Sequence, residues 1–339
     1  MSQETILPGI ATDKAERLRM KTLFNLSSSN EDLSRYQNQQ ELLSDMQGFD
    51  GLELLYMGPD RAGIIPTGKV LGLHLSFPSY WLDFWRQDEP ALRQEFGSLA
   101  AAAAYYGGDD PQLLCEHLQE ELRIARQYGA EYLVFHGADC SMAEAFTQSY
   151  RHSDAEVIDG VCDLLNQAFG AEDGPWLLVE NLWHSGFRFT EPQLTQRLLS
   201  GLRYPKKGIM LDTGHLAHTN RQLRRPEEAA AYIRQRLAEH GELCRYIKGV
   251  HLNLSLTGAY AESVMAAPPR LAADYPTRCG QLFRHIFQQD QHQPFLCPKV
   301  AELIRDIDPS YLTYEFITES RRQQQEYLSA QRQVLSGLY

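Results

Sequence analysis

Six apolar runs of the sequence end in a side chain that can bind a metal ion or move a proton. These residues are His74, His136, Glu180, Asp212, His251 and Glu315, and His215 follows Asp212 by three positions. Burial of such a group is costly unless the group is paired or bound to a cation. One histidine at the end of a buried strand is usually an ordinary core residue with a hydrogen-bond partner. Six such polar strand ends are poorly explained as six independent structural groups. Imidazoles and carboxylates that converge in one cavity indicate a site for a divalent metal such as zinc, manganese, iron or cobalt.

The elements that must position these side chains are short strands that alternate with amphipathic helices. Nearly continuous apolar runs are typical of parallel strands buried on both faces. They predict eight strands, at 21–26, 51–57, 69–76, 131–136, 176–180, 207–212, 246–252 and 311–316. Helices are predicted near 31–47, 81–98, 112–128, 154–169, 191–203, 226–240, 298–306 and 319–337. Eight such units favour a single (β/α)8 TIM barrel of the α/β class over a doubly wound open sheet. In such barrels the site lies at the C-terminal ends of the strands, where the six residues fall.

Three further segments complete the predicted organisation. Residues 1–20 are predicted as an N-terminal extension, residues 21–318 as the barrel domain and residues 319–339 as a C-terminal helix. Within the barrel domain, residues 254–295 show little strand character and are predicted as a long loop after the seventh strand. Loops of this length are uncommon unless they are functional. We therefore expect a lid or substrate loop there, with a plain insertion as the alternative.

Composition and charge restrict the class of protein and its partners. The chain has 339 residues, of which 43% are hydrophobic and 22% charged, as in a globular protein. Its net charge of −12 disfavours a nucleic-acid partner, because duplex binding depends on clustered lysine and arginine, so we expect a small-molecule substrate. Six cysteines without a CxxC pair indicate reduced thiols, and neither a signal peptide nor a membrane span is apparent. The sequence thus predicts a cytoplasmic protein and leaves its oligomeric state open.

The ordered motifs at the strand ends resemble the endonuclease IV and xylose isomerase-like TIM-barrel superfamily, which includes AP endonuclease family 2 and proteins similar to sugar phosphate isomerases and epimerases. The resemblance covers about residues 20–318 and depends on VFHG, LLVENLW, LDTGHLA, GVHLN and TYEF in this order. It implies a metal-dependent enzyme on a (β/α)8 barrel.

Two branches of this superfamily imply different metal sites. The isomerases and epimerases resemble one-metal enzymes, and the matching ligands are Glu180, Asp212, His251 and Glu315. Endonuclease IV has two more metals, for which the matching residues are His74, His136 and Glu180 in one site and His215, Asp290 and His292 in the other. Asp290 lies 39 residues after His251, so its match requires an insertion. The resemblance therefore implies two or three divalent ions, of zinc, manganese or iron.

Several reactions are compatible with these residues. We favour hydrolysis of a phosphoester, in which Glu180 bridges two metals that activate water. The alternative is isomerisation or epimerisation of a sugar or sugar phosphate through an enediolate, with Glu180 and Glu315 as the catalytic carboxylates. A multinuclear iron oxygenase and a non-catalytic barrel with a relict site are further alternatives. Hydrolysis is preferred because the pair of His74 and His136 and the D-x-H of Asp290 and His292 exceed what an isomerase needs.

Residues near the ligands are weaker candidates for substrate binding. Trp183, Arg188 and Phe77 are predicted to contact the substrate, with core packing or solvated surface as the alternative for each. His184 and His218 follow ligand positions and could contact the substrate, but the favoured interpretation is that both are exposed loop residues.

Overall fold

Eight parallel strands form a closed barrel in the order β1-β10-β9-β8-β6-β4-β3-β2. The computed structural model describes residues 19–171 and 173–338, so residues 1–18 of the predicted N-terminal extension lie outside the described residues. The barrel strands are β1 (Lys21–Ser27), β2 (Gly51–Leu55), β3 (Val70–His74), β4 (Tyr132–His136), β6 (Trp176–Glu180), β8 (Lys207–Asp212), β9 (Ile247–Leu252) and β10 (Tyr311–Tyr314). The closed barrel confirms the predicted fold and excludes the open sheet.

The register of the strands places the functional residues on one rim. Parallel pairing sets His136 at the end of β4 opposite Glu180 at the end of β6. In the same way, Asp212 at the end of β8 lies opposite His251 on β9. The strands are apolar because the interior of the barrel covers one face and the helices cover the other. Polar side chains at the strand ends are therefore brought together at the C-terminal mouth.

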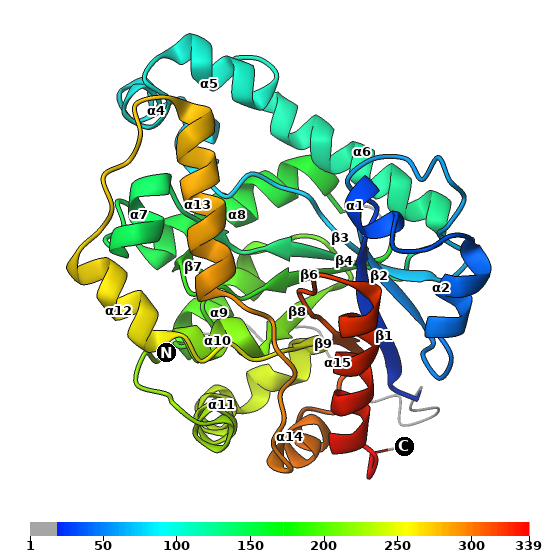
Figure 1. Cartoon of the computed structure of the whole chain (residues 1–339). Helices are drawn as coiled ribbons and strands as arrows, with labels where there is room; N and C mark the ends of the chain where they lie inside the picture. The colour runs from blue at the N-terminus through cyan, green and yellow to red at the C-terminus, as the bar shows by residue number, and fades with distance from the viewer. Residues whose placement is uncertain (1–18, 172, 339) are drawn as a thin grey trace, which may run out of the picture.

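Helices surround the barrel on its outside (Figure 1). They are α1 (Asn30–Leu33), α2 (Gln39–Asp45), α3 (Leu82–Trp85), α4 (Glu89–Phe96), α5 (Leu99–Tyr106), α6 (Gln112–Tyr128), α7 (Met142–Thr147), α8 (Asp154–Phe169), α9 (Pro192–Gly201), α10 (Thr213–His218), α11 (Pro226–His240), the 3-10 helix η1 (Gly241–Tyr246), α12 (Gly258–Ala266), α13 (Tyr275–Gln289), α14 (Lys299–Ile307) and α15 (Arg321–Val334). A small antiparallel pair, β5 (Ala138–Asp139) and β7 (Ser185–Gly186), links two loops at the mouth. The stretch 56–69 between β2 and β3 contains no helix, so the outer layer is interrupted there.

The segment 254–295 contains two helices, α12 and α13, where the sequence analysis predicted a long loop. Pro276 lies in the first turn of α13, where its missing N–H removes no helical hydrogen bond. The helix packs on α7, with the His285 ring stacked on Phe146 at 4.5 Å. A bridge between Leu254 and Gln293 closes the segment at its base. The insertion is therefore a packed helical pair, and Figure 1 shows it beside α7.

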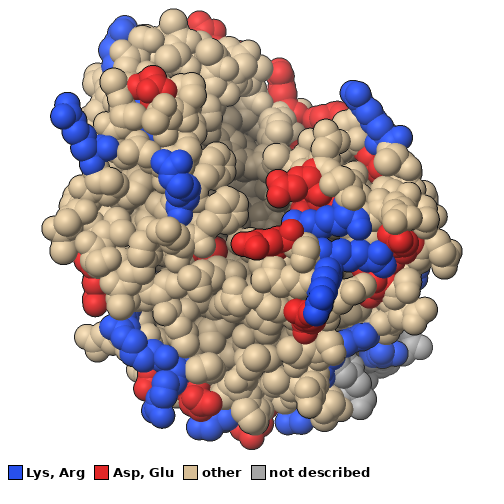
Figure 2. Space-filling view, in the orientation of Figure 1, with Lys and Arg blue, Asp and Glu red and all other residues tan. Residues whose placement is uncertain are grey.

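The C-terminal helix is confirmed as α15, which packs against the barrel. Gln331 on this helix accepts a hydrogen bond from the backbone N–H of Phe295 at 2.7 Å. Arg321 at its first turn pairs with Asp45 at 2.7 Å. Over the described residues, every helix is too short or too polar to cross a membrane. Figure 2, in the orientation of Figure 1, shows basic and acidic side chains mixed on one face, with a hollow near its centre.

Candidate metal centre

The nine side chains predicted as metal ligands meet at the C-terminal mouth of the barrel. Eight of them form three overlapping groups, in each of which the ligand atoms lie within 4.8 Å of one another: His74, His136 and Glu180; Glu180, Asp212, His251 and Glu315; Asp212, His215 and His292. The ninth is Asp290, whose Oδ2 lies 3.1 Å from Nε2 of His215 and 2.8 Å from Nε2 of His292. Glu180 and Asp212 each belong to two groups, so the three groups form one cluster.

The first group is the part of the cluster that is open to solvent. Nε2 of His74 and Nε2 of His136 lie 3.2 Å and 3.4 Å from Oε2 of Glu180. The His136 side chain is 42% exposed, whereas the Glu180 side chain is fully buried. Nδ1 of His74 contacts the carbonyl oxygen of Leu75 at 3.2 Å, and since a carbonyl only accepts, Nδ1 carries the proton. The other nitrogen of His74 therefore faces the carboxylate.

Asp212 is fixed by the helix that follows it. It is the N-cap of α10, and its Oδ1 accepts a hydrogen bond from the backbone N–H of His215 at 2.6 Å. Its Oδ2 accepts from the side-chain amide of Asn253 at 2.7 Å. Aspartate is a favoured N-cap because its oxygen satisfies an amide of the first turn. The LDTGH sequence thereby holds both Asp212 and His215 at the mouth.

Buried polar atoms without a hydrogen-bond partner lie at the centre of the cluster. Among the described residues, Oε1 of Glu180, Nδ1 of His251 and Nδ1 of His292 have no such partner. Nδ1 of His292 lies 3.5 Å from Oε2 of Glu315. Unsatisfied polar atoms are rare in protein interiors, because each has lost its contact with water. Lone pairs of carboxylate oxygen and imidazole nitrogen that face one another fit a divalent cation, so the residues present match the group that the sequence implied.

His251 is oriented by Glu53, which the sequence analysis did not single out. Nε2 of His251 lies 2.9 Å from Oε1 of Glu53. Burial alone would raise the pKa of Glu53, but His251 holds the pKa below its usual range, so Glu53 is ionised. An ionised carboxylate only accepts hydrogen bonds, so Nε2 donates and Nδ1 is directed at the cluster. Hydroxyl groups of Tyr132 and Thr313 complete the contacts of Glu53, at 2.6 Å and 3.0 Å.

The D-x-H of the insertion reaches the cluster because α13 ends there. Asp290 is the C-cap of α13, and His292 follows with a φ of +44° in the left-handed region. Oδ1 of Asp290 also lies 3.4 Å from Nε2 of His218 and accepts a hydrogen bond from the Ser255 hydroxyl at 3.2 Å. The predictions that His218 and His184 are exposed are wrong, because both are buried beside Trp183.

Burial and neighbouring charges shift the pKa values of the ionisable groups in the cluster in different directions. Burial would raise the pKa of Glu180, but His251 and His136 hold it well below its usual range. Burial raises the pKa of Glu315 to about 7, although His251 and His292 oppose the rise. Burial alone would lower the pKa of His292, but Asp290 and Glu315 raise it to about 9. A cluster of this kind binds protons and cations in competition.

The three predicted substrate contacts lie in different environments. Trp183 is buried, and its ring centroid lies 5.1 Å from that of His215, so it forms a wall of the cluster. Arg188 is held by Asp154 at 3.1 Å and lines a pocket with Trp183. Phe77 is half-buried and packs on Phe135 with ring centroids 5.0 Å apart. Trp183 and Arg188 thus border a cavity, whereas the contacts of Phe77 are those of core packing.

The closed barrel and the cluster at its mouth define a (β/α)8 protein with a candidate multinuclear metal centre. The family model of the xylose isomerase-like TIM barrel matches residues 41–332, and the chain belongs to this family. This confirms the resemblance found in the sequence. Members of the family are mostly enzymes and commonly bind divalent metals.

Solved structures similar to this chain share its fold. A putative xylose isomerase from Rhodospirillum rubrum is 14% identical with a TM-score of 0.55, over 94% of this chain and 99% of that chain. A D-tagatose 3-epimerase-like protein is 14% identical with a TM-score of 0.50 over the same shares. Endonuclease IV from Thermus thermophilus is 16% identical with a TM-score of 0.45, again over 94% and 99%. A search of curated proteins finds no match.

Proposed function

We propose that the protein is a metal-dependent enzyme that hydrolyses a phosphoester of a small molecule at a site for two or three divalent cations. The observation that supports this most is the overlap of the three ligand groups through Glu180 and Asp212. A single tetrahedral ion needs four ligands. The remaining ionisable residues, His74, His136, His215, Asp290 and His292, would then lie at the mouth without a cation to compensate their desolvation.

The directions of the ligand atoms indicate which residues would hold each cation. Oε2 of Glu180 is directed at His74 and His136, and Oε1 at His251 and His215, at distances between 3.1 Å and 3.4 Å. Glu180 can therefore bridge two cations. His74 and His136 would complete one site, Asp212, His251 and Glu315 the second, and His215, Asp290 and His292 the third. Bound cations supply an activated water and neutralise charge that develops on a phosphoryl group.

The exposure of the ligands indicates the side from which the substrate enters. His136 is half-exposed, while His215 and His251 are buried. The substrate therefore approaches over His136, between the loops that follow β3 and β4. Trp183 packs on His215, with ring centroids 5.1 Å apart, and so shields the third group from water. The net charge of −12 favours a small molecule over a nucleic acid.

Isomerisation or epimerisation of a sugar or sugar phosphate through an enediolate is the second candidate. The group of Glu180, Asp212, His251 and Glu315, taken by itself, favours this candidate. In this group Nδ1 of His251 lies 3.2 Å from Glu180 and 3.3 Å from Glu315. Two carboxylates that face one position could remove and return a proton next to a carbonyl. Both candidates make Glu180 essential.

Parallel assays on the metal-reconstituted full chain test the proposal. One arm measures phosphate release from phosphomonoesters and release of the alcohol from phosphodiesters. The other measures incorporation of solvent deuterium into ketoses and ketose phosphates by NMR. We expect hydrolysis that Glu180→Gln abolishes. Deuterium incorporation without any hydrolysis would favour the second candidate and overturn the first.

A further inference from the structure

A pocket of about 470 Å³ lies beside the metal centre. Trp183 and His218 line it, and both also contact the cluster, Trp183 through His215 and His218 through Asp290. The volume is in the range of pockets that bind small molecules. Most of the lining side chains are polar or charged, among them Arg188 and Arg221. The charges of these side chains indicate which kind of ligand the pocket could bind.

Arg221 brings a positive charge that no carboxylate neutralises among the described residues. Its NH1 donates to Oε1 of Gln148 at 2.8 Å and contacts Sδ of Met265 at 3.3 Å, and both partners are neutral. Nε and NH2 of Arg221 have no acceptor in the part of the chain that the structure describes. A guanidinium with free N–H groups is suited to bind a phosphate or carboxylate through two parallel hydrogen bonds.

The other charges of the pocket are already balanced. Arg188 pairs with Asp154 at 3.1 Å, and its guanidinium lies 5.1 Å from the centroid of the Tyr150 ring. Glu262 is the acidic residue of the lining, and it lies 3.8 Å from Arg224. These pairs leave the charge of Arg221 as the excess charge in the pocket. An anion is therefore attracted there even though the whole chain is acidic.

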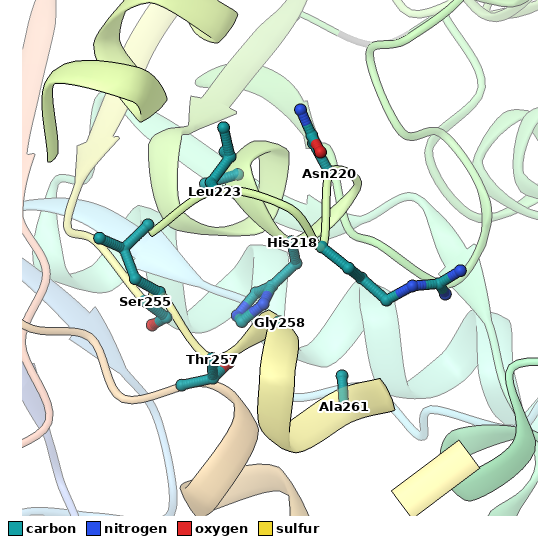
Figure 3. Close-up of a pocket in the computed structure, with 10 residues that line it drawn as sticks. His218, Asn220, Leu223, Ser255, Thr257, Gly258 and Ala261 are labelled. Carbon is teal, nitrogen blue, oxygen red and sulfur yellow. The ribbon is translucent and has the colours of Figure 1, made fainter. Parts of the chain in front are cut away.

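The turn that carries Arg221 is fixed by close packing against α12. A Cβ atom at Gly258 would lie 2.0 Å from the carbonyl oxygen of Arg221, so the two segments touch. Figure 3 shows His218 near Thr257 and Gly258, and these residues line a small cavity of about 10 Å³. Such a cavity has room for about one water molecule. A turn held in place before the ligand arrives loses less entropy on binding.

We propose that this pocket binds an oxyanion group, a phosphate or a carboxylate, of a small molecule, with Arg221 as the principal cation. The site goes beyond the proposed function because none of the proposed metal ligands lines it. Gln148 and Met265 orient the guanidinium, and Arg188 also lines the pocket. Binding at this pocket needs no metal, which separates it from binding of the same anion to the cluster.

Isothermal titration calorimetry of the full chain tests the proposal, with inorganic phosphate and acetate as separate probes. Each probe is titrated into metal-loaded and chelator-treated protein. We expect saturable binding of at least one probe in both forms, and the stronger probe identifies phosphate or carboxylate as the preferred group. Arg221→Gln should weaken binding by about 10-fold or more, because a hydrogen bond to a charged group is lost. Arg221→Lys keeps the positive charge but loses the two parallel N–H donors of the guanidinium, so it should weaken binding less than Arg221→Gln does.

The matched control is Arg225→Gln, since the Arg225 side chain is 71% exposed and pairs with Glu228 outside the pocket. It should leave binding unchanged, and circular dichroism of each variant checks its fold. Binding that requires the metals and tolerates Arg221→Gln would place the anion on the cluster and overturn the proposal. Absence of saturable binding of both probes would also overturn it. Metal content is measured separately, so a failure here is distinct from a failure of the proposed function.

Discussion

Oε1 of Glu180 and Nδ1 of His251 lie 3.2 Å apart at the centre of the cluster, and neither atom has a hydrogen-bond partner among the described residues. Both side chains are completely buried. Two lone pairs in this arrangement repel each other unless a cation or a proton lies between them. In the metal-free protein a proton can take this place, because Glu315, Glu53 and Glu180 raise the pKa of His251 well above its usual range despite burial.

Metal binding should therefore release protons and become stronger as the pH rises. Burial lowers the pKa of both imidazoles, but Glu315 raises that of His251 and Asp212 raises that of His215 well above the usual range, so each imidazole binds a proton more tightly than a free imidazole does. A metal must displace these protons, and acid favours the metal-free state. We expect release of at least one proton per metal bound, measured by calorimetry in buffers of different ionisation enthalpy. Metal affinity that is constant between about pH 6 and 8 would contradict this.

His136→Ala should remove one metal equivalent and leave the others in place. His136 belongs to the first group alone, so the four residues Glu180, Asp212, His251 and Glu315 stay intact. The measurement is metal content per chain after identical purification. His117→Ala on α6 is the control, since this half-exposed histidine belongs to none of the three groups. Loss of all metal, or of none, would contradict separate sites.

His292→Ala should remove the metal of the third group. Nε2 of His292 lies 2.8 Å from Asp290, and the substitution removes one of the two imidazoles of that site, leaving His215 with the carboxylates of Asp290 and Asp212, the latter shared with the second group. A site that loses an imidazole ligand and shares one of its carboxylates with a second cation holds a divalent ion poorly. Unchanged metal content in this variant would show that the D-x-H of the insertion is not a metal site.

Glu53→Gln should weaken metal binding by about 10- to 100-fold, the usual effect of losing the carboxylate partner of a ligating histidine. The amide group that this substitution introduces can donate a hydrogen bond to Nε2 of His251. This allows the tautomer in which Nδ1 carries the proton and cannot bind the metal. The affinity is measured by competition with a chelator. Asp159→Asn, which breaks the exposed pair with Arg197, is the control and should leave the affinity unchanged. A lower melting temperature with normal metal affinity would assign Glu53 a structural role only.

Gly258→Ala should destabilise the protein by roughly 1–3 kcal/mol, because the added methyl group overpacks the contact with the Arg221 carbonyl. The measurement is urea unfolding. Gly280→Ala in α13 is the matched control, since the nearest atom to its added Cβ is a flexible Arg284 nitrogen at 3.8 Å. Alanine has a higher helix propensity than glycine in a helix interior, so this control substitution should be neutral or stabilising. Equal effects of the two substitutions would argue against the close contact.

The sequence predicted the barrel and the convergence of the nine residues because parallel strands align their C-terminal ends. His136 and Glu180 end their strands in the sequence and lie opposite each other in the register. The structure also brings Asp290 to His215, although an insertion separates it from β9. That these residues bind metal stays a prediction.

Other features depend on tertiary contacts that the sequence does not display. Glu53 lies inside an apolar strand, and the register of β2 with β3 shifts between Leu52 and Glu53, so strand alternation alone could not place its side chain. The burial of His218 depends on Trp183 and on Asp290, which is 72 residues away. The helix α13 was missed because Pro276 resembles a turn signal when its position in the first turn is unknown.

The metal content per chain, with the identity of each element, shows whether the cluster at the mouth of the barrel binds divalent cations. The measurement is elemental mass spectrometry of the full chain, purified without chelator under anaerobic conditions. We expect two or three equivalents of zinc or manganese. Two or three equivalents of iron would indicate oxygen chemistry instead of hydrolysis, and a single ion would favour the isomerase. Protein that binds no metal even after reconstitution would contradict the metal centre itself.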